Sequence, residues 1–244
     1  MIKSLTIIFP LYNETERLKY CFDDIEKFNV KKKIKNLEYI FVDDGSTDGS
    51  SQIIKKFINK KKKEKKNIKY KLLKISKNKG KGNALSKGVK AASKNWILTI
   101  DTDISVSISE LNNWFKKKNI KFYNNIFFGS RNLKKSIVKF EYHRKLIGIV
   151  FIFLTKFFFN IKLNDTQCGF KLYPKKVAKK IFNSLTDKGF AHDIEIVLLA
   201  KKYNVEISEM PVTWVHKNNS KINFLKDSLN IFFSLKKIKE KFNH

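Results

Sequence analysis

Apolar residues in the first part of the chain follow two patterns that alternate. Short continuous runs rich in Ile, Leu, Val and Phe are typical of buried strands, and the segments between them place apolar residues every three or four positions, as amphipathic helices do. Strands are predicted at 4–9, 37–42, 69–75 and 96–100, and helices at 14–28, 48–58 and 81–92. This alternation predicts an α/β fold with a mostly parallel central sheet and helices on both faces.

Polar clusters directly follow three of these strands. They are residues 10–14 (PLYNE), 43–46 (DDGS) and 101–103 (DTD). Ligands of open α/β sheets bind outside the carboxyl ends of the strands. We therefore expect the three clusters to converge at one edge of the sheet and to form the functional site.

Glycine spacing argues against two common nucleotide-binding sites. No G-x-G-x-x-G follows the first strand, and Gly80-Lys81-Gly82 lacks the remaining spacing of a P-loop, which disfavours an oxidoreductase and an NTPase. Asp101 and Asp103, by contrast, are carboxylates two residues apart at a strand end. Such a pair can hold a hard divalent cation shared with substrate phosphates. Turn capping is the alternative explanation of the same pair.

The charge is strongly basic, with 52 Lys and Arg against 22 Asp and Glu and a formal net charge of +30. Arginine occurs only at positions 17, 131 and 144. A nucleic-acid-binding protein would be expected to use arginine forks, and the acidic clusters would face a polyanion. We therefore expect no nucleic-acid partner and keep this class as the remote alternative. The lysine run at 60–66 is predicted to be a solvated loop, with contact to an anionic surface as the alternative.

We expect one domain, because no linker rich in Pro, Gly or Ser divides the chain; its halves are 1–132 and a membrane-facing 133–244. The apolar segment 146–159 has an uncharged stretch too short for a spanning helix, which needs about 20 residues. Residues 224–242 have the spacing of an amphipathic basic helix. Both segments are predicted to be interfacial helices. Docking of the C-terminal helix on the core is an equal alternative.

The cellular setting is predicted from the cysteines and the N-terminus. Cys21 and Cys168 lie far apart, and the first residues lack the layout of a signal peptide. We expect a cytoplasmic protein that is peripheral on the inner face of the membrane.

A set of motifs in fixed order resembles a known family. The motifs are FPLYNE (9–14), VDDGSTDG (42–49), NKGKGNA (78–84), DTD (101–103), GSR (129–131), DTQCGFKL (165–172) and HDIE (192–195). The set as a whole resembles the family-2 glycosyltransferases with the GT-A fold. Its last two members are similar to the branch that loads sugars onto polyprenyl phosphates, including dolichyl-phosphate glucosyltransferases and mannose synthases.

The resemblance implies a nucleotide-sugar donor and a divalent metal, Mg²⁺ or Mn²⁺. Asp101 and Asp103 would be its ligands, and Ser105 stands where mannose synthases often have a further ligand. The residues implied in nucleotide-sugar binding are Pro10, Tyr12, Glu14, Asp43, Asp44, Lys81 and Asp101.

The resemblance also implies an acceptor site and catalytic groups. Lys221 would face the donor diphosphate, and His192 is predicted to be a solvent-facing polar residue. The implied acceptor-binding residues are Arg131, Arg144, Gln167 and Gly169. The implied catalytic residues are Asp103, Arg131, Arg144, Lys221 and Asp193.

The implied reaction is inverting transfer of a hexose to a polyprenyl phosphate, with UDP-glucose favoured as the donor. A phosphate monoester has a second pKa of about 6, so the acceptor oxygen is largely ionised and needs no strong base. The alternatives are a GDP-mannose-using enzyme of the same branch and a soluble family-2 enzyme acting on a glycan, with Asp193 or Glu195 as its base. The implied partners are the nucleotide sugar, the lipid phosphate, the membrane surface and a downstream membrane glycosyltransferase or flippase.

Overall fold

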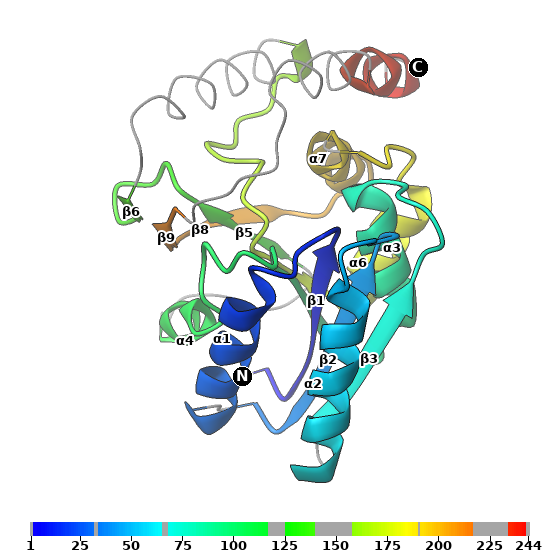
Figure 1. Ribbon diagram of the computed structural model, residues 1–244. Coiled ribbons are helices and arrows are strands. Elements are labelled where there is room, and N and C mark those ends of the chain that lie inside the picture. Colours follow the sequence, from blue (N-terminus) through cyan, green and yellow to red (C-terminus); the bar gives the residue numbers. More distant parts are fainter. Residues whose placement is uncertain are drawn as a thin grey trace.

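The structure is a computed structural model that describes residues 2–31, 34–64, 68–116, 125–139, 158–189, 191–216 and 234–242. Within these ranges the strands form a seven-stranded sheet, in the order β3-β2-β1-β4-β7-β5-β8, and a two-stranded sheet, β6-β9 (Figure 1). The strands are β1 (Ser4–Leu11), β2 (Asn36–Asp43), β3 (Ile68–Lys74), β4 (Trp96–Thr99), β5 (Ile126–Ser130), β6 (Ile137–Lys139), β7 (Lys171–Pro174), β8 (Ile207–Pro211) and β9 (Thr213–Val215). The helices are α1 (Leu18–Lys31), α2 (Ser50–Glu64), α3 (Lys81–Ala91), α4 (Glu110–Phe115), α6 (Lys175–Ser184) and α7 (His192–Lys202).

Parallel pairing brings the carboxyl ends of three strands together, as predicted. β1 pairs in parallel with β2 and β4, and its register sets Leu11 opposite Asp43 and Ile8 opposite Thr99. β7 is antiparallel to both neighbours and lies between β4 and β5. The predicted mostly parallel sheet is therefore confirmed, with one reversed strand that the hydrophobic pattern did not indicate.

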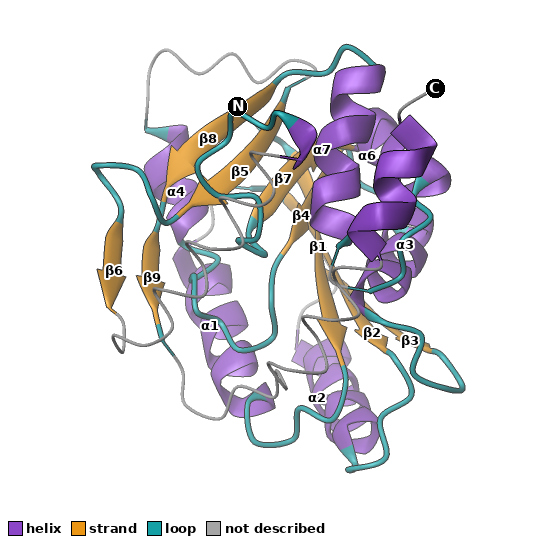
Figure 2. Cartoon of the chain, turned by 90° about the horizontal axis from the view of Figure 1, so that it is seen from above, coloured by secondary structure: helices purple, strands orange, loops and turns teal. Residues whose placement is uncertain are grey.

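Helices cover both faces of the sheet because successive side chains of a strand point to opposite faces. Leu5, Ile7 and Phe9 of β1 pack in the core that contains the buried faces of α1, α2 and α4. Ile8 packs in a second core with α3, α6 and α7. Figure 2 shows α3, α6 and α7 gathered on one side of the sheet. The prediction of helices on both faces is confirmed.

Two local predictions need correction. The helix predicted from residue 14 begins at Leu18, because a turn formed by Arg17 N–H and Glu14 C=O precedes it. The lysine run is not a loop over its described part, since α2 continues to Glu64. Lysine is a good helix former, and Lys61 is buried with its ammonium 2.7 Å from Glu26 and 2.8 Å from Glu64.

The last described segment, residues 234–242, is helical and packs on the core. Leu235 and Ile238 are buried beside Ile194 and Leu198 of α7. This part of the predicted amphipathic helix docks on the protein, while residues 224–233, and 146–157 of the apolar segment, lie outside the described ranges. Among the helices that the structure describes, none has the length and apolar character needed to cross a bilayer.

A buried carboxylate ties the first three strands to the loop after α3. Glu38 on β2 has a fully buried side chain, and it accepts hydrogen bonds from the Thr6 hydroxyl at 2.6 Å and the Ser93 N–H at 2.8 Å. The Lys71 ammonium lies 2.8 Å from its other oxygen. Burial alone would raise the pKa of Glu38, but these donors outweigh it and lower the pKa below its ordinary value.

Replacing this carboxylate is expected to destabilise the fold in a pH-dependent way. Glu38→Gln should lower the free energy of unfolding by about 1.5–3 kcal/mol at neutral pH, as for a hydrogen bond to a charged group. Because the folded pKa is lowered, this stabilisation is complete above the unfolded pKa and is lost as the pH falls through the folded pKa. Urea denaturation at neutral and acidic pH, with the exposed Glu240→Gln as control, should show the deficit shrinking in acid. An equal deficit at both pH values would contradict the role of the charge.

Candidate active site

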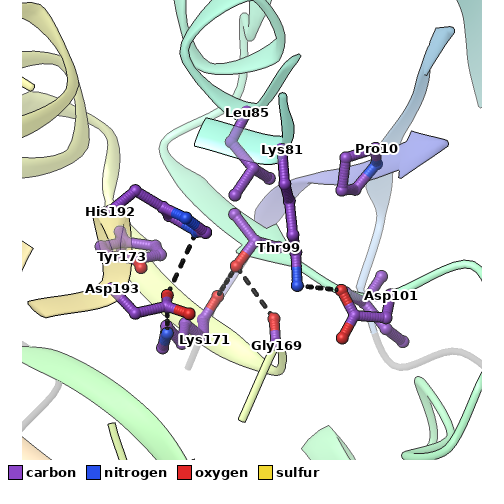
Figure 3. Close-up of a pocket in the computed structure, with 11 residues that line it drawn as sticks. Pro10, Lys81, Leu85, Thr99, Asp101, Gly169, Lys171, Tyr173, His192 and Asp193 are labelled. Atoms are coloured by element: carbon purple, nitrogen blue, oxygen red, sulfur yellow. Dashed lines mark hydrogen bonds and ion pairs between the residues drawn. The ribbon is translucent and has the colours of Figure 1, made fainter. Parts of the chain in front are cut away.

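A pocket lies at the carboxyl ends of β1 and β4, where the sequence predicted the site (Figure 3). It brings together five residues that the sequence analysis assigned to the site and six that it did not. The former are Pro10, Lys81, Asp101, Gly169 and Asp193. The latter are Leu85, Thr99, Ile100, Lys171, Tyr173 and His192.

The loop that follows β4 carries the Asp-x-Asp pair and is tied to the end of β1. The Thr102 hydroxyl donates a 2.8 Å hydrogen bond to Pro10 C=O. One Asp103 oxygen accepts the Ser105 N–H at 2.9 Å. Burial and the neighbouring Asp101 raise the pKa of Asp103. Two carboxylates thus lie close together on a loop that the adjacent strand holds in place.

Gly169 allows a close approach to the first of these carboxylates. An added Cβ at this position would lie only 2.7 Å from Asp101 Oδ1 and would also collide with the other carboxylate oxygen. Any side chain at 169 would therefore displace the carboxylate of Asp101. The structure gives this glycine, named from the sequence as acceptor-binding, a direct steric reason to lack a side chain.

Lys81, the first residue of α3, extends toward the centre of the pocket and pairs with Asp101 (Figure 3). Its ammonium lies 2.6 Å from Asp101 Oδ1. Burial alone would lower the pKa of Lys81, but the charges of Asp101 and Asp193 outweigh it and raise the pKa well above its ordinary value. The site therefore contains a lysine that is positively charged at all physiological pH values.

The position of Lys81 depends on Asp44. The Asp44 carboxylate accepts the N–H groups of Lys79 at 3.0 Å and of Gly80 at 2.6 Å. Gly80 has φ +99°, a conformation that glycine adopts readily and other residues rarely do. Asp44, predicted as a nucleotide-binding residue, is thus placed where it orients the loop that leads into Lys81.

A buried ion pair lies on the other side of the pocket. Lys171, on β7, is almost completely buried and bonds through its ammonium to Asp193, in the first turn of α7. Burial alone would raise the pKa of Asp193, but the His192 ring and the ammonium groups of Lys171 and Lys81 outweigh it and lower the pKa below its ordinary value. Asp193, proposed from the sequence as catalytic, is therefore an ionised carboxylate with a bound cation.

His192 is buried, which corrects its prediction as a solvent-facing residue. Only 1% of its surface is exposed, because it begins α7 against Gly82, where an added Cβ would lie 2.9 Å from the His192 Cβ. Its Nδ1 is 2.6 Å from Gly189 C=O and its Nε2 is 3.2 Å from Asp193. Burial lowers the pKa of His192.

The loops after β1 and β2 are hydrogen-bonded to one another. Asn13 N–H donates to the Ser46 hydroxyl at 2.9 Å, and Thr47 N–H donates to the Asn13 side chain at 2.8 Å. Asp43 is buried and accepts from Ser46 N–H at 2.8 Å and from the Ser51 hydroxyl. These hydrogen bonds hold the loop after β1 against the loop after β2.

Two further residues predicted to bind the nucleotide, Tyr12 and Glu14, lie on the loop after β1. Tyr12 is 41% exposed, which leaves its ring accessible for stacking. Glu14 donates its N–H to the Ser50 hydroxyl, and its carboxylate lies 3.4 Å from Arg17. Both lie on the loop after β1, at the same edge of the sheet as the pocket.

Arg131, at the end of β5, is held by Asp165. Its Nε and Nη2 donate to the two Asp165 oxygens at 2.7 and 2.9 Å, in a forked pair. Burial alone would lower the pKa of Arg131, but Asp165 outweighs it and raises the pKa. Asp165 also accepts the N–H of Gln167 at 3.0 Å. The predicted phosphate-binding arginine and the predicted acceptor residue Gln167 therefore share one organising carboxylate.

Three other predicted residues lie away from the pocket or outside the described ranges. Arg144 and Lys221 are not among the residues that the structure describes. Glu195 is fully buried and accepts hydrogen bonds from Thr186 and Asp187, with the Lys241 ammonium 2.5 Å away. It is not one of the residues that line the pocket.

Sequence reasoning gave no role to Lys171, although one signal was present. It stands between Phe170 and Leu172, both almost completely buried. A lysine inside an apolar strand is rarely buried without a partner of opposite charge. Its partner Asp193 is distant in sequence, so the pattern alone did not identify the pair.

The donor set suits a hard divalent cation. Within the described ranges no three His, Cys, Asp or Glu side chains are grouped to hold a metal by themselves. Asp101 and Asp103 supply two carboxylates, and Mg²⁺ is commonly held by one or two carboxylates together with substrate phosphates and water. The residues present therefore fit a metal that binds together with a diphosphate.

Known proteins resemble this chain in sequence and in fold. Residues 6–182 match the family described as glycosyl transferase family 2. Dolichyl-phosphate beta-glucosyltransferase of Dictyostelium discoideum is 32% identical over 234 residues, covering 92% of this chain and 70% of that protein. The enzyme of the same name from Homo sapiens is 32% identical over 230 residues, covering 90% and 70%.

Solved structures extend the likeness to the fold. Glucosyl-3-phosphoglycerate synthase from Mycobacterium tuberculosis in complex with UDP has a TM-score of 0.65 at 13% identity, covering 98% of this chain and 80% of that one. Mannosyl-3-phosphoglycerate synthase from Rubrobacter xylanophilus has a TM-score of 0.67 at 13% identity, covering 98% and 73%. The predicted GT-A fold is confirmed. With the sequence match over most of its length, the chain belongs to glycosyl transferase family 2.

Proposed function

We propose that this chain transfers glucose from UDP-glucose to a dolichyl or other polyprenyl phosphate, with inversion at the anomeric carbon. The observation that carries the proposal is the 32% identity, over 92% of the chain, to an enzyme named dolichyl-phosphate beta-glucosyltransferase. The pocket supports it, because Asp101 and Lys81 line it at the sheet edge where ligands of this fold class bind, and Asp103 follows two residues after Asp101 on the same loop.

Charge stabilisation at the donor diphosphate is the first part of the proposed mechanism. Lys81 supplies a fixed positive charge beside Asp101. Mg²⁺ or Mn²⁺, held by Asp101 and Asp103, would neutralise negative charge on the leaving nucleoside diphosphate when bound. Tyr12, exposed at the end of β1, is placed to stack on the base. Lys221 remains proposed as a further cation at the diphosphate.

The acceptor phosphate needs positioning more than deprotonation. An ionised phosphate oxygen attacks the anomeric carbon, the new C–O bond forms as the bond to the nucleoside diphosphate breaks, and an α-linked donor gives a β-linked product. Arg131, oriented by Asp165, is proposed to hold this phosphate together with Arg144. The fork to Asp165 uses Nε and Nη2, so Nη1 is the nitrogen proposed to meet the phosphate.

The two candidate bases already have cations and hydrogen-bond donors bound to them. This favours transfer to a phosphate over transfer to a glycan hydroxyl. Asp193 is bound by Lys171, and Glu195 accepts bonds from Thr186, Asp187 and Lys241. Cations and donors bound to a carboxylate lower its proton affinity. A hydroxyl acceptor would need a base with a higher proton affinity, whereas an ionised phosphate would not.

Asp103 is expected to be required for turnover but not for folding. Asp103→Ala should lower kcat by at least about 10²-fold, about 3 kcal/mol of transition-state stabilisation, because it removes half of the proposed metal site. The variant should keep the circular dichroism spectrum of the wild type. Asp23→Ala, at an exposed position on α1, is the matched control. Full wild-type turnover in EDTA would rule out the metal.

The donor is tested by competition between labelled sugars. Purified protein, Mg²⁺ and a short polyprenyl phosphate are incubated with UDP-glucose and GDP-mannose together, each with its own label. Because a site that hydrogen-bonds particular hydroxyls rejects mismatched sugars, kcat/KM should be at least about 10-fold higher for UDP-glucose. Preference for GDP-mannose would reverse the donor assignment, and no label in the organic phase with either donor would overturn the proposed function.

We also propose peripheral attachment to the cytoplasmic membrane face through the apolar segment 146–159. Phe158, at the end of this segment, is 39% exposed, and lysines flank the segment, which suits contact with anionic lipid. Phe151→Asp with Phe158→Asp should abolish sedimentation with anionic liposomes. The control is Ile53→Asp, which changes an exposed apolar residue on α2. Unchanged binding by the folded double variant would refute attachment through this segment.

A further inference from the structure

We propose that Lys81 competes with the divalent metal for Asp101, so that the metal binds tightly only when a nucleoside diphosphate has drawn the ammonium away from that carboxylate. The inference rests on the proposed function, because it assumes that the divalent metal and the nucleoside diphosphate both bind in this pocket. It adds an order of binding: the diphosphate arrives before the metal or together with it.

The geometry at Asp101 carries this inference. The Lys81 ammonium lies 2.6 Å from Oδ1, which is the distance of a charge-assisted hydrogen bond (Figure 3). The carboxylate also packs against Gly169, where a Cβ would lie 2.7 Å from Oδ1. A metal that binds Asp101 must therefore approach a carboxylate whose Oδ1 already contacts the Lys81 ammonium and whose one side is covered by Gly169.

Another anion is needed to draw Lys81 away from Asp101. The ammonium already forms a close ion pair with Oδ1 of that carboxylate. A diphosphate in the pocket is an anion that attracts the ammonium in the same way.

Removal of the Lys81 charge is predicted to have opposite effects on the two binding steps. Without nucleotide, Lys81→Gln should strengthen metal binding, because the competing cation is gone. With nucleotide, the same change should weaken binding of the diphosphate, because one of the cations proposed to contact it is gone. A lysine that only bound the diphosphate would show the second effect alone, and a lysine that only began α3 would show neither.

The experiment measures Mn²⁺ binding to the full chain by electron paramagnetic resonance, with and without UDP. In the wild type, UDP should tighten Mn²⁺ binding at least about fivefold, the lower end of typical coupling between sites. Lys81→Gln should bind Mn²⁺ at least about fivefold more tightly than the wild type without UDP, and the further tightening by UDP should be smaller than in the wild type. Lys79→Gln, an exposed neighbour, should behave as the wild type, and Lys81→Arg should keep the competition.

The outcomes separate this inference from the proposed function. Weaker or unchanged Mn²⁺ binding by Lys81→Gln without UDP overturns the inference and leaves the proposed function standing, provided that the wild type binds UDP. A wild type that binds no UDP overturns both. Circular dichroism checks the fold of each variant, and Lys81→Met, which keeps the alkyl stem and removes only the charge, serves if Gln disturbs α3.

Discussion

The carboxylates buried at the edge of the sheet need hydrogen-bond donors or cations as partners, because a buried charge without a partner would strongly destabilise the fold. Asp43 and Asp44 meet this requirement with backbone N–H groups and a serine hydroxyl, Asp165 with Arg131, and Asp193 with Lys171. The rest of the site depends on this matching. Each satisfied carboxylate fixes one loop or one cation, so the pocket is built before any ligand arrives.

The same requirement separates structural acids from exchangeable ones. The side chains of Asp165 and Asp193 are 1% and 6% exposed, whereas that of Asp101 is 40% exposed. An exposed carboxylate can exchange its partner for a ligand, and a buried one would be left with an uncompensated charge. Ligand chemistry is therefore assigned to Asp101, and positioning to Asp43, Asp44, Asp165 and Asp193.

Sequence patterns predicted the site where the chemistry follows strand ends and failed where it depends on distant pairings. The strands that end at Leu11, Asp43 and Thr99 were recognised from their apolar runs, and parallel pairing placed the clusters after them. The sequence of β7 does not indicate that this strand runs antiparallel to its neighbours. Gly169 and Lys171 lie beside the pocket because β7 is inserted between β4 and β5, and this pairing joins segments that are distant in the sequence.

The errors have the same physical origin. His192 was predicted to face solvent because it is polar, but its position at the start of α7 buries it against Gly82. The lysine run was predicted to be solvated because of its charge, but residues 60–64 continue α2 and Lys61 has acidic partners. In both cases a contact with a neighbouring element decided the outcome, and the residue's own polarity did not.

The configuration of the transferred sugar distinguishes direct transfer to the acceptor phosphate from transfer through a sugar bound to the protein. A site that orients an already ionised phosphate for a single displacement, without a protein nucleophile, must invert the anomeric carbon of the donor. Proton NMR of the purified glycolipid phosphate made from α-linked UDP-glucose should therefore show a β-linked glucose. An α-linked product would contradict the account, because it requires either a covalent intermediate on the protein or a different path of attack.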